Sequence, residues 1–209
     1  NEDIPHRNPG AELGDYTGIP VNDADRRKAD SWDASILSQP ERQAQSHPVQ
    51  YHMRGPRPDL RILKVLDPVT QVQVAYAMAG MYGRADRVIW LDGRKHPSDY
   101  SEHTWDGFST GVWENGRLVV TTTHVKEGYI RRTGLMRSDR TTVRTRWRRM
   151  GNYLQLTVIM YDPVYLAEPY IRSALMYVND PAMPMDPYPC EEATETAVER
   201  RSEEHTSEL

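Results

Sequence analysis

The sequence Ser109-Thr-Gly-Val-Trp-Glu-Asn-Gly-Arg-Leu-Val-Val-Thr-Thr-Thr123 carries the strongest local pattern of the 209-residue chain. Asn115-Gly116 separates two stretches of alternating side chains, which is typical of a β-hairpin with a type I′ turn. This turn predicts the cross-strand pairs Glu114–Arg117, Trp113–Leu118, Gly111–Val120 and Ser109–Thr122. The first pair is oppositely charged, which supports the register. We expect Trp113 to be buried beside Leu118 and Val120, and Gly111 to leave room for a side chain or a ligand.

Alternating segments continue on both sides of this hairpin. Together with its two strands they make eight predicted strands, the other six covering residues 60–66, 72–78, 86–91, 141–149, 154–160 and 170–178. Short connections favour an antiparallel meander, and a meander of this size usually hides its edges by closing on itself. We therefore predict a mostly β fold, an antiparallel meander closing into a lipocalin-like β-barrel, with one short N-terminal helix.

The helix is predicted from about Asp23 to Ser35. Asn22 has the chemistry of an N-cap, and the acidic Asp23 and Asp25 complement the helix dipole in the first turn. The predicted organisation is an arm with this helix (1–58), a barrel domain (59–178) and a Pro-rich then acidic extension (179–200). Residues 201–209 form a separate tail.

The tail, Arg201-Ser-Glu-Glu-His-Thr-Ser-Glu-Leu209, is what the start of a common sequencing adapter encodes. Segments of this origin are excluded from fold reasoning, and we expect both natural ends of the protein to be missing. The tail has one Arg and three Glu, so it contributes −2 of the formal net charge of −4 and leaves −2 for the body.

The bulk composition narrows the class of protein. A nearly neutral body does not indicate a nucleic-acid partner, and no apolar run approaches the length of a membrane span. Cys190 is the only cysteine, so the chain forms no internal disulfide and cysteine usage leaves the compartment open.

Several motifs in order resemble an uncharacterised family of exported bacterial proteins. They include Asp92-Gly-Arg-Lys-His-Pro97, His103-Thr-Trp-Asp-Gly-Phe-Ser-Thr-Gly111 with Trp113-Glu114, Leu118-Val-Val-Thr-Thr-Thr123, Asp162-Pro163 with Glu168-Pro169, and Met185-Asp-Pro-Tyr-Pro-Cys190. The resemblance covers roughly residues 14–190. It implies a periplasmic or secreted location and no particular reaction. Ala44 stands near a position where the family tends to have Cys, which excludes a bridge to Cys190 here.

The best candidate for chemistry is a group of histidines, His96, His103 and His124, with Asp92, Asp99 and Asp106 nearby in the sequence. In the predicted register Gly107 lies opposite His124, so the His103 and His124 imidazoles could converge at one end of the barrel. Catalysis is assigned to His103, His124 and Asp106 as general acid–base groups or metal ligands. The spacing matches no known ligand motif, so no metal or cofactor is specified, and loop histidines bonded to the backbone are the alternative.

Residues 126–149 contain nine basic side chains against Glu127 and Asp139. They could bind an anionic ligand, but alternating Arg144, Arg146 and Arg148 are more typical of the wet face of an edge hairpin. An eight-stranded barrel can hold one small molecule. The residues assigned to such a ligand cavity are Tyr76, Trp90, Trp105, Gly111 and Trp113.

Three functions remain open from the sequence. The leading one is an exported barrel that binds a small, partly apolar molecule. The alternative is a small barrel enzyme using His/Asp chemistry, and the third is a structural or interaction domain. A cavity reached by His103 and His124 favours the enzyme, an apolar cavity favours the carrier, and a filled interior favours the third.

Overall fold

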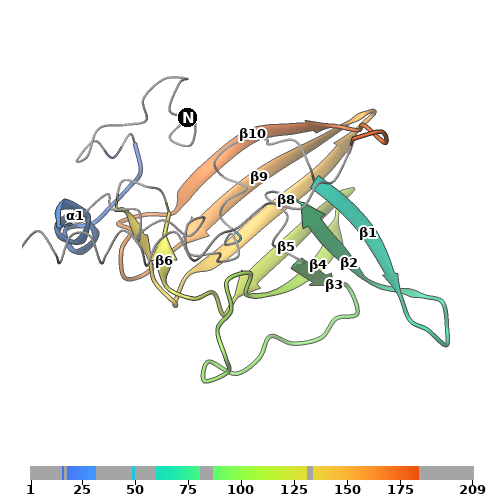
Figure 1. The fold of residues 1–209 in the computed structure, drawn as a ribbon, viewed down its shortest axis with the longest axis horizontal. Coiled ribbons are helices and arrows are strands. Elements are labelled where there is room, and N and C mark those ends of the chain that lie inside the picture. The colour runs from blue at the N-terminus through green and yellow to red at the C-terminus, as the bar shows by residue number, and fades with distance from the viewer. Residues whose placement is uncertain are drawn as a thin grey trace, which may run out of the picture.

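The described part of the chain is mostly β: eight of its strands form one large mixed sheet, two short strands form a second sheet, and one helix lies at one end (Figure 1). The computed structural model describes residues 16, 18–31, 49, 60–80, 87–130 and 134–183. Its elements are α1 (Asp23–Asp30), β1 (Leu60–Leu66), β2 (Gln73–Gly80), β3 (Arg87–Trp90), β4 (Phe108–Glu114), β5 (Arg117–Thr123), β6 (Gly128–Tyr129), β7 (Met136–Arg137), β8 (Thr142–Met150), β9 (Tyr153–Tyr161) and β10 (Tyr170–Val178).

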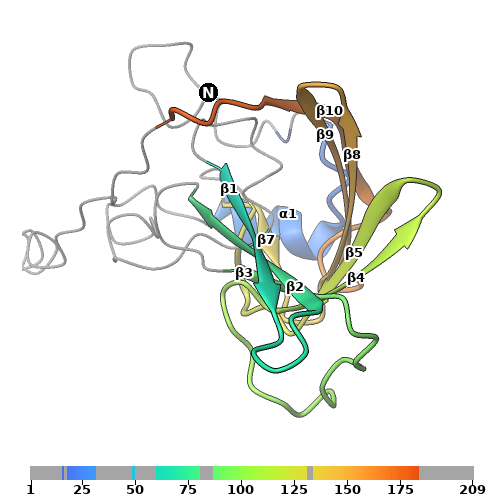
Figure 2. The same cartoon turned by 90° about the vertical axis from the view of Figure 1, so that its right-hand side faces the viewer.

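The large sheet contains the eight predicted strands. Their spatial order is β1-β2-β3-β4-β5-β8-β9-β10, and β6 pairs with β7 in a separate two-stranded sheet that the sequence did not predict. Figure 2 looks across the sheet, with β1–β3 and β8–β10 on its two sides and β4–β5 at the bend.

The sheet is not a purely antiparallel meander. β3 and β4 run parallel, with Ile89 opposite Ser109 and Trp90 opposite Thr110, because the long 91–107 connection carries the chain back before β4 begins. β1 and β10 lie at the two ends of the strand order, so the described strands form an open, curved sheet, and closure into a barrel is not found.

The predicted hairpin register is confirmed at every pair, but the predicted burial of Trp113 is wrong. Leu118 and Val120 are buried, whereas Trp113 is 60% exposed. The described part of β3 pairs with β4 only at Ser109 and Thr110, so the far half of β4 projects beyond it (Figure 2). Leu118 is covered because it faces Trp147 on β8. A shared face therefore does not guarantee shared burial at the tip of a hairpin.

Alternation in β8 and β9 produces the core. Val143, Thr145 and Trp147 are buried, while Arg144, Arg146 and Arg148 are exposed on the other face as the sequence predicted. However, β8 lies between β5 and β9, so these arginines cover an interior strand and not an edge. On β9, Leu156, Val158 and Met160 extend the same apolar layer across the sheet.

The helix α1 ends earlier than predicted. Asn22 caps it as expected, because its side chain accepts from the backbone N–H groups of Ala24 and Asp25. The helix ends at Asp30 and Ser31 caps its C-terminus; residues 32–35 of the predicted helix lie outside the described residues. Most of the predicted arm, most of the extension with Cys190, and the 201–209 tail also lie outside the described residues.

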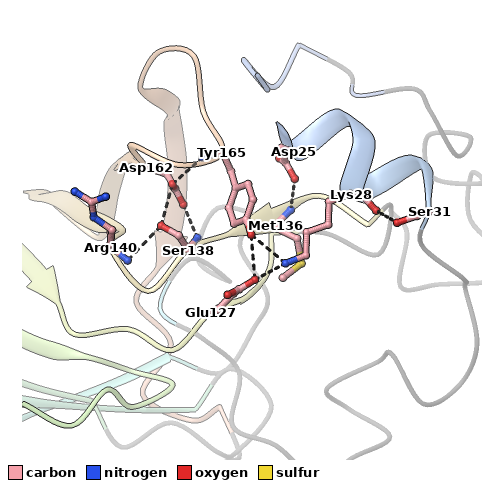
Figure 3. A network of polar contacts seen from close by, with 9 residues as sticks. All are labelled: Asp25, Lys28, Ser31, Glu127, Met136, Ser138, Arg140, Asp162 and Tyr165. Atoms are coloured by element: carbon pink, nitrogen blue, oxygen red, sulfur yellow. Dashed lines mark hydrogen bonds and ion pairs between the residues drawn. The ribbon is translucent and has the colours of Figure 1, made fainter. Parts of the chain in front are cut away.

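Polar contacts join α1 to the small sheet and to the loop after β9 (Figure 3). Lys28 Nζ donates to Glu127 Oε1 at 2.5 Å and to the Tyr165 hydroxyl at 3.0 Å. The buried Asp25 carboxylate accepts from the Met136 backbone N–H at 2.9 Å. These contacts hold α1, β6 and β7 at one end of the large sheet, the end at which β5 finishes.

Candidate functional site

A pocket of about 430 Å³ lies at the end of the sheet where β8 turns into β9. Its volume falls within the range of small-molecule sites, roughly 300–1,000 Å³. The sheet curves enough for β1 to share this pocket with β9 and β10. The lining residues are Leu60, Ile62, Arg149, Gly151, Asn152, Tyr153, Leu154, Tyr177, Val178 and Asn179.

The pocket lining is mixed, with polar and apolar surface in similar amounts. Tyr177 is 9% exposed, and its ring stacks on Trp147 with centroids 6.4 Å apart. Its hydroxyl is buried without a hydrogen-bond partner in the described part of the chain, and burial raises the pKa of Tyr177 to about 12. A buried hydroxyl normally finds a partner, since leaving it unpaired is costly. The Tyr177 hydroxyl is therefore a donor that no described residue uses, on a residue that lines the pocket.

The predicted convergence of His103 and His124 is present at the opposite end of the strands. Their ring centroids are 5.2 Å apart. The β4–β5 ladder ends at the Phe108–Thr123 pair, one step short of the predicted Gly107–His124 pair. Beyond it the Thr104 N–H donates to the His124 carbonyl at 2.9 Å, which brings the preceding His103 beside the His124 ring.

Hydrogen bonds assign the protons of two imidazoles. His124 Nε2 lies 2.8 Å from the Ser98 carbonyl, which only accepts, so Nε2 carries a hydrogen; in the tautomer with its one hydrogen there, Nδ1 accepts from the Thr123 hydroxyl at 2.7 Å. His96 Nδ1 then donates to Thr123 Oγ1 at 2.7 Å, and His96 Nε2 accepts from Thr110 Oγ1 at 2.8 Å. Burial, and secondarily His124, lowers the pKa of His96. Both nitrogens of each ring therefore have a hydrogen-bond partner.

His103, like His96, is half-buried. Its Nδ1 donates to the Val125 carbonyl at 3.0 Å, which leaves Nε2 as the acceptor of the neutral ring, without a hydrogen bond to a described residue. Among the described residues, no three His, Cys, Asp or Glu side chains are placed to hold a metal ion. The geometry thus leaves one imidazole nitrogen available for proton transfer and provides no described metal centre.

Asp106, the predicted carboxylate partner, acts on buried arginines. Burial lowers the pKa of Arg87 to about 10, and Asp106 opposes that shift. Burial likewise lowers the pKa of Arg137 to about 10, against the carboxylates of Asp162, Asp106 and Glu127. Asp106 therefore lies within electrostatic reach of two guanidinium groups.

The residues assigned to ligand binding lie outside the lining of the 430 Å³ pocket. The space that Gly111 was expected to leave for a ligand is filled by neighbouring side chains, because a Cβ at Gly111 would lie 2.9 Å from Ile89 Cγ2 and 3.1 Å from Leu118 Cδ1. Tyr76 is half-buried against the core. The Arg94 guanidinium covers the Trp90 ring at 3.4 Å from its centroid, and Trp105 is half-buried beside Gly128. Trp113 is exposed.

Sequence reasoning missed the pocket because its residues come from three separate segments. Tyr177 and Leu154 face each other across β9 and β10, and Leu60 reaches them only through the curvature of the sheet. The usable signal was local: Tyr177 lies at an inward position of a predicted strand, where a phenol needs a polar partner.

No protein-family model matches the chain, and comparison with curated proteins and with solved structures gave no significant match. The one helix among the described residues has eight residues and is too short to cross a membrane.

Proposed function

We propose that the protein binds a small, partly apolar molecule in the pocket at the β8–β9 turn. The observation that carries the proposal is the pocket of about 430 Å³, whose lining includes Tyr177, a residue with a buried hydroxyl that has no hydrogen-bond partner in the described part of the chain. Ligand sites typically combine apolar walls with a few polar groups that fix orientation. Leu60, Ile62 and Leu154 provide the apolar surface in this interpretation, and Tyr177 provides the orienting donor.

The polar rim narrows the class of ligand. Arg149, Asn152 and Asn179 also line the pocket, and Arg149 Nε donates to the Gly151 carbonyl at 3.1 Å. We expect the ligand to place its apolar body against β1 and β9 and an acceptor, such as a carbonyl or ether oxygen, near Tyr177. As in lipocalins, the ligand would lie at the mouth of a curved sheet.

The test is a titration with Nile red, a neutral and largely apolar dye, followed by its fluorescence. Ile62→Trp adds bulk on the pocket wall and should weaken binding about tenfold or more, the result of losing roughly 1.4 kcal/mol. Ile171→Trp is the matched control, because Ile171 is exposed on β10 and does not line the pocket. Equal binding by both variants, or no binding by the unmodified protein, contradicts the proposal.

A small enzyme using His103 and His124 is the second candidate, favoured by the 5.2 Å approach of their rings. In this alternative His103 Nε2 takes a proton, and His124 and Asp106 are the further acid–base groups predicted from the sequence. Hydrolysis of p-nitrophenyl acetate by His103→Gln and His96→Gln variants tests it. Loss in the first and retention in the second would support it, since both His96 nitrogens are already bonded. Equal rates in all three proteins would refute it.

The proposed location is periplasmic or secreted. It rests on the resemblance of the 92–111, 118–123 and 162–169 motifs to exported bacterial proteins. A fusion of the complete natural reading frame to alkaline phosphatase, which is active only after export, tests it in a bacterial host. Phosphatase activity equal to that of a leaderless fusion would contradict the proposed location.

A further inference from the structure

A second feature of the interior is a guanidinium group with no hydrogen-bond acceptor. Arg137, on β7, has 0% exposure. Within the described part of the chain, its Nε, Nη1 and Nη2 atoms have no hydrogen-bond partner. Arginine keeps its proton inside proteins, so five N–H donors are buried together with a positive charge. Burying a charge without hydrogen bonds is costly, and such groups are normally paired.

The carboxylates around Arg137 are engaged elsewhere (Figure 3). Asp162 accepts five hydrogen bonds: from the Ser138 N–H and hydroxyl, the Thr141 hydroxyl, and the N–H groups of Val164 and Tyr165. Burial raises the pKa of Asp162, but these bonds outweigh it and hold that pKa below its usual value. Glu127 Oε1 accepts from Lys28 and from Tyr165. These two carboxylates therefore compensate the charge of Arg137 without receiving its hydrogen bonds.

Arg87 is a second buried arginine, and Asp106 acts on it as well as on Arg137. Arg87 is 3% exposed; its Nε donates to Ser109 Oγ at 3.1 Å and its Nη2 to Thr122 Oγ1 at 2.7 Å. Its Nη1 has no partner in the described part of the chain. Asp106 acts electrostatically on both Arg87 and Arg137.

Two glycines connect the arginines to the 105–107 segment. A Cβ on Gly128 would lie 3.6 Å from Arg137 Nη2 and 3.2 Å from Trp105 Cζ3, so the guanidinium and the indole meet over this glycine. A Cβ on Gly107 would lie 3.0 Å from Thr122 Cγ2, on the residue that binds Arg87. Both arginines thus border the turn that carries Asp106.

We propose that this interior binds an oxyanion, the carboxylate or phosphate group of a small molecule, through the Arg137 guanidinium with Arg87 Nη1 as an additional donor. A planar guanidinium matches a carboxylate or phosphate with two parallel hydrogen bonds. The site is separate from the 430 Å³ pocket, since neither arginine lines that pocket.

The test is isothermal titration calorimetry with inorganic phosphate and, separately, with acetate, in chloride buffer of matched ionic strength. We expect saturable binding of at least one anion. The anion that binds more tightly indicates whether the site prefers a phosphate or a carboxylate group. Arg137→Met should weaken this binding at least about tenfold, as expected for loss of a charged hydrogen-bonding group. Arg146→Met removes the same charge from an exposed position and should leave binding unchanged.

Because Arg137→Met could fail to fold, a second variant is needed for which tighter anion binding is expected. Asp106→Asn removes a negative charge that acts on both arginines, so it should tighten anion binding. No saturable binding by the unmodified protein, equal binding by Arg137→Met, or weaker binding by Asp106→Asn would each overturn the proposal.

Discussion

Replacing Asp25 by Asn should stabilise the protein at pH 8. Asp25 has 0% exposure, its Oδ1 accepts from the Met136 N–H, and its Oδ2 has no partner in the described part of the chain. Burial raises the pKa of Asp25 from 3.8 to about 6. Asn can keep the bond to Met136 through its own Oδ1, while removing the buried charge.

The magnitude follows from the pKa difference. The difference between a pKa of 3.8 and one of about 6 corresponds to roughly 3 kcal/mol, since a tenfold change in an equilibrium constant is about 1.36 kcal/mol. Asp25 lies in the first turn of α1, where loss of a negative charge costs about 0.3–1 kcal/mol. We expect Asp25→Asn to gain about 2 kcal/mol at pH 8. Because the pKa is higher in the folded state, the charge destabilises the fold fully above pH 6, and the gain should disappear as the pH falls from 6 toward 3.8.

Urea unfolding at several pH values measures this gain. With a slope of about 1–3 kcal/mol per molar urea, the midpoint at pH 8 should rise by roughly 1 M. Asp23→Asn is the control, because Asp23 lies in the same turn but is exposed; it should show only the loss of about 0.3–1 kcal/mol expected for a charge in the first turn, with no gain at pH 8. A variant less stable than the unmodified protein at pH 8, or a gain independent of pH, would refute the reasoning.

Two further predictions use matched pairs. Trp113→Ala should cost less than about 1 kcal/mol because Trp113 is 60% exposed, whereas Trp147→Ala should cost about 3–5 kcal/mol because Trp147 is 3% exposed; urea midpoints of both variants distinguish them. Similar costs would mean that the hairpin tip packs against other parts of the chain. Gly107→Ala should destabilise by several kcal/mol, since its Cβ would lie 2.4 Å from the Thr123 carbonyl, while Gly116→Ala, at a similar positive φ but in open space, should cost about 1 kcal/mol by thermal unfolding. A smaller loss at Gly107 than at Gly116 would contradict the close approach of the two segments.

The local features of the fold could be predicted from the sequence. Alternation located all eight strands of the large sheet, and Asn115-Gly116 fixed a hairpin register that the structure reproduces. It also placed His103 near His124, although the ladder ends one step earlier and His124 adopts a positive φ of 56°. These features depend on neighbouring residues along one hairpin, which a single sequence specifies directly.

The non-local features could not be predicted. Nothing in the β3 or β4 sequence reveals that they pair in parallel, because the direction is set by the path of the 91–107 connection. Trp113 was predicted to be buried because the alternating pattern shows on which face of the strand a side chain lies. The pattern does not show whether another part of the chain covers that face. The pocket depends on the curvature that brings β1 near β10, and the burial of Arg137 depends on the short β6–β7 sheet.

The most direct test of the proposed ligand pocket is nuclear magnetic resonance mapping of backbone amides with and without Nile red. We expect the largest chemical-shift changes at the pocket residues, above all Leu154, Tyr177 and Asn179, with a smaller effect relayed to Trp147 through its ring contact with Tyr177. Amides around His103 and His124, at the other end of the strands, should not move. Shifts confined to the histidine end, or no shifts at Leu154 and Tyr177 at saturating dye, would contradict the assignment of this pocket as the binding site.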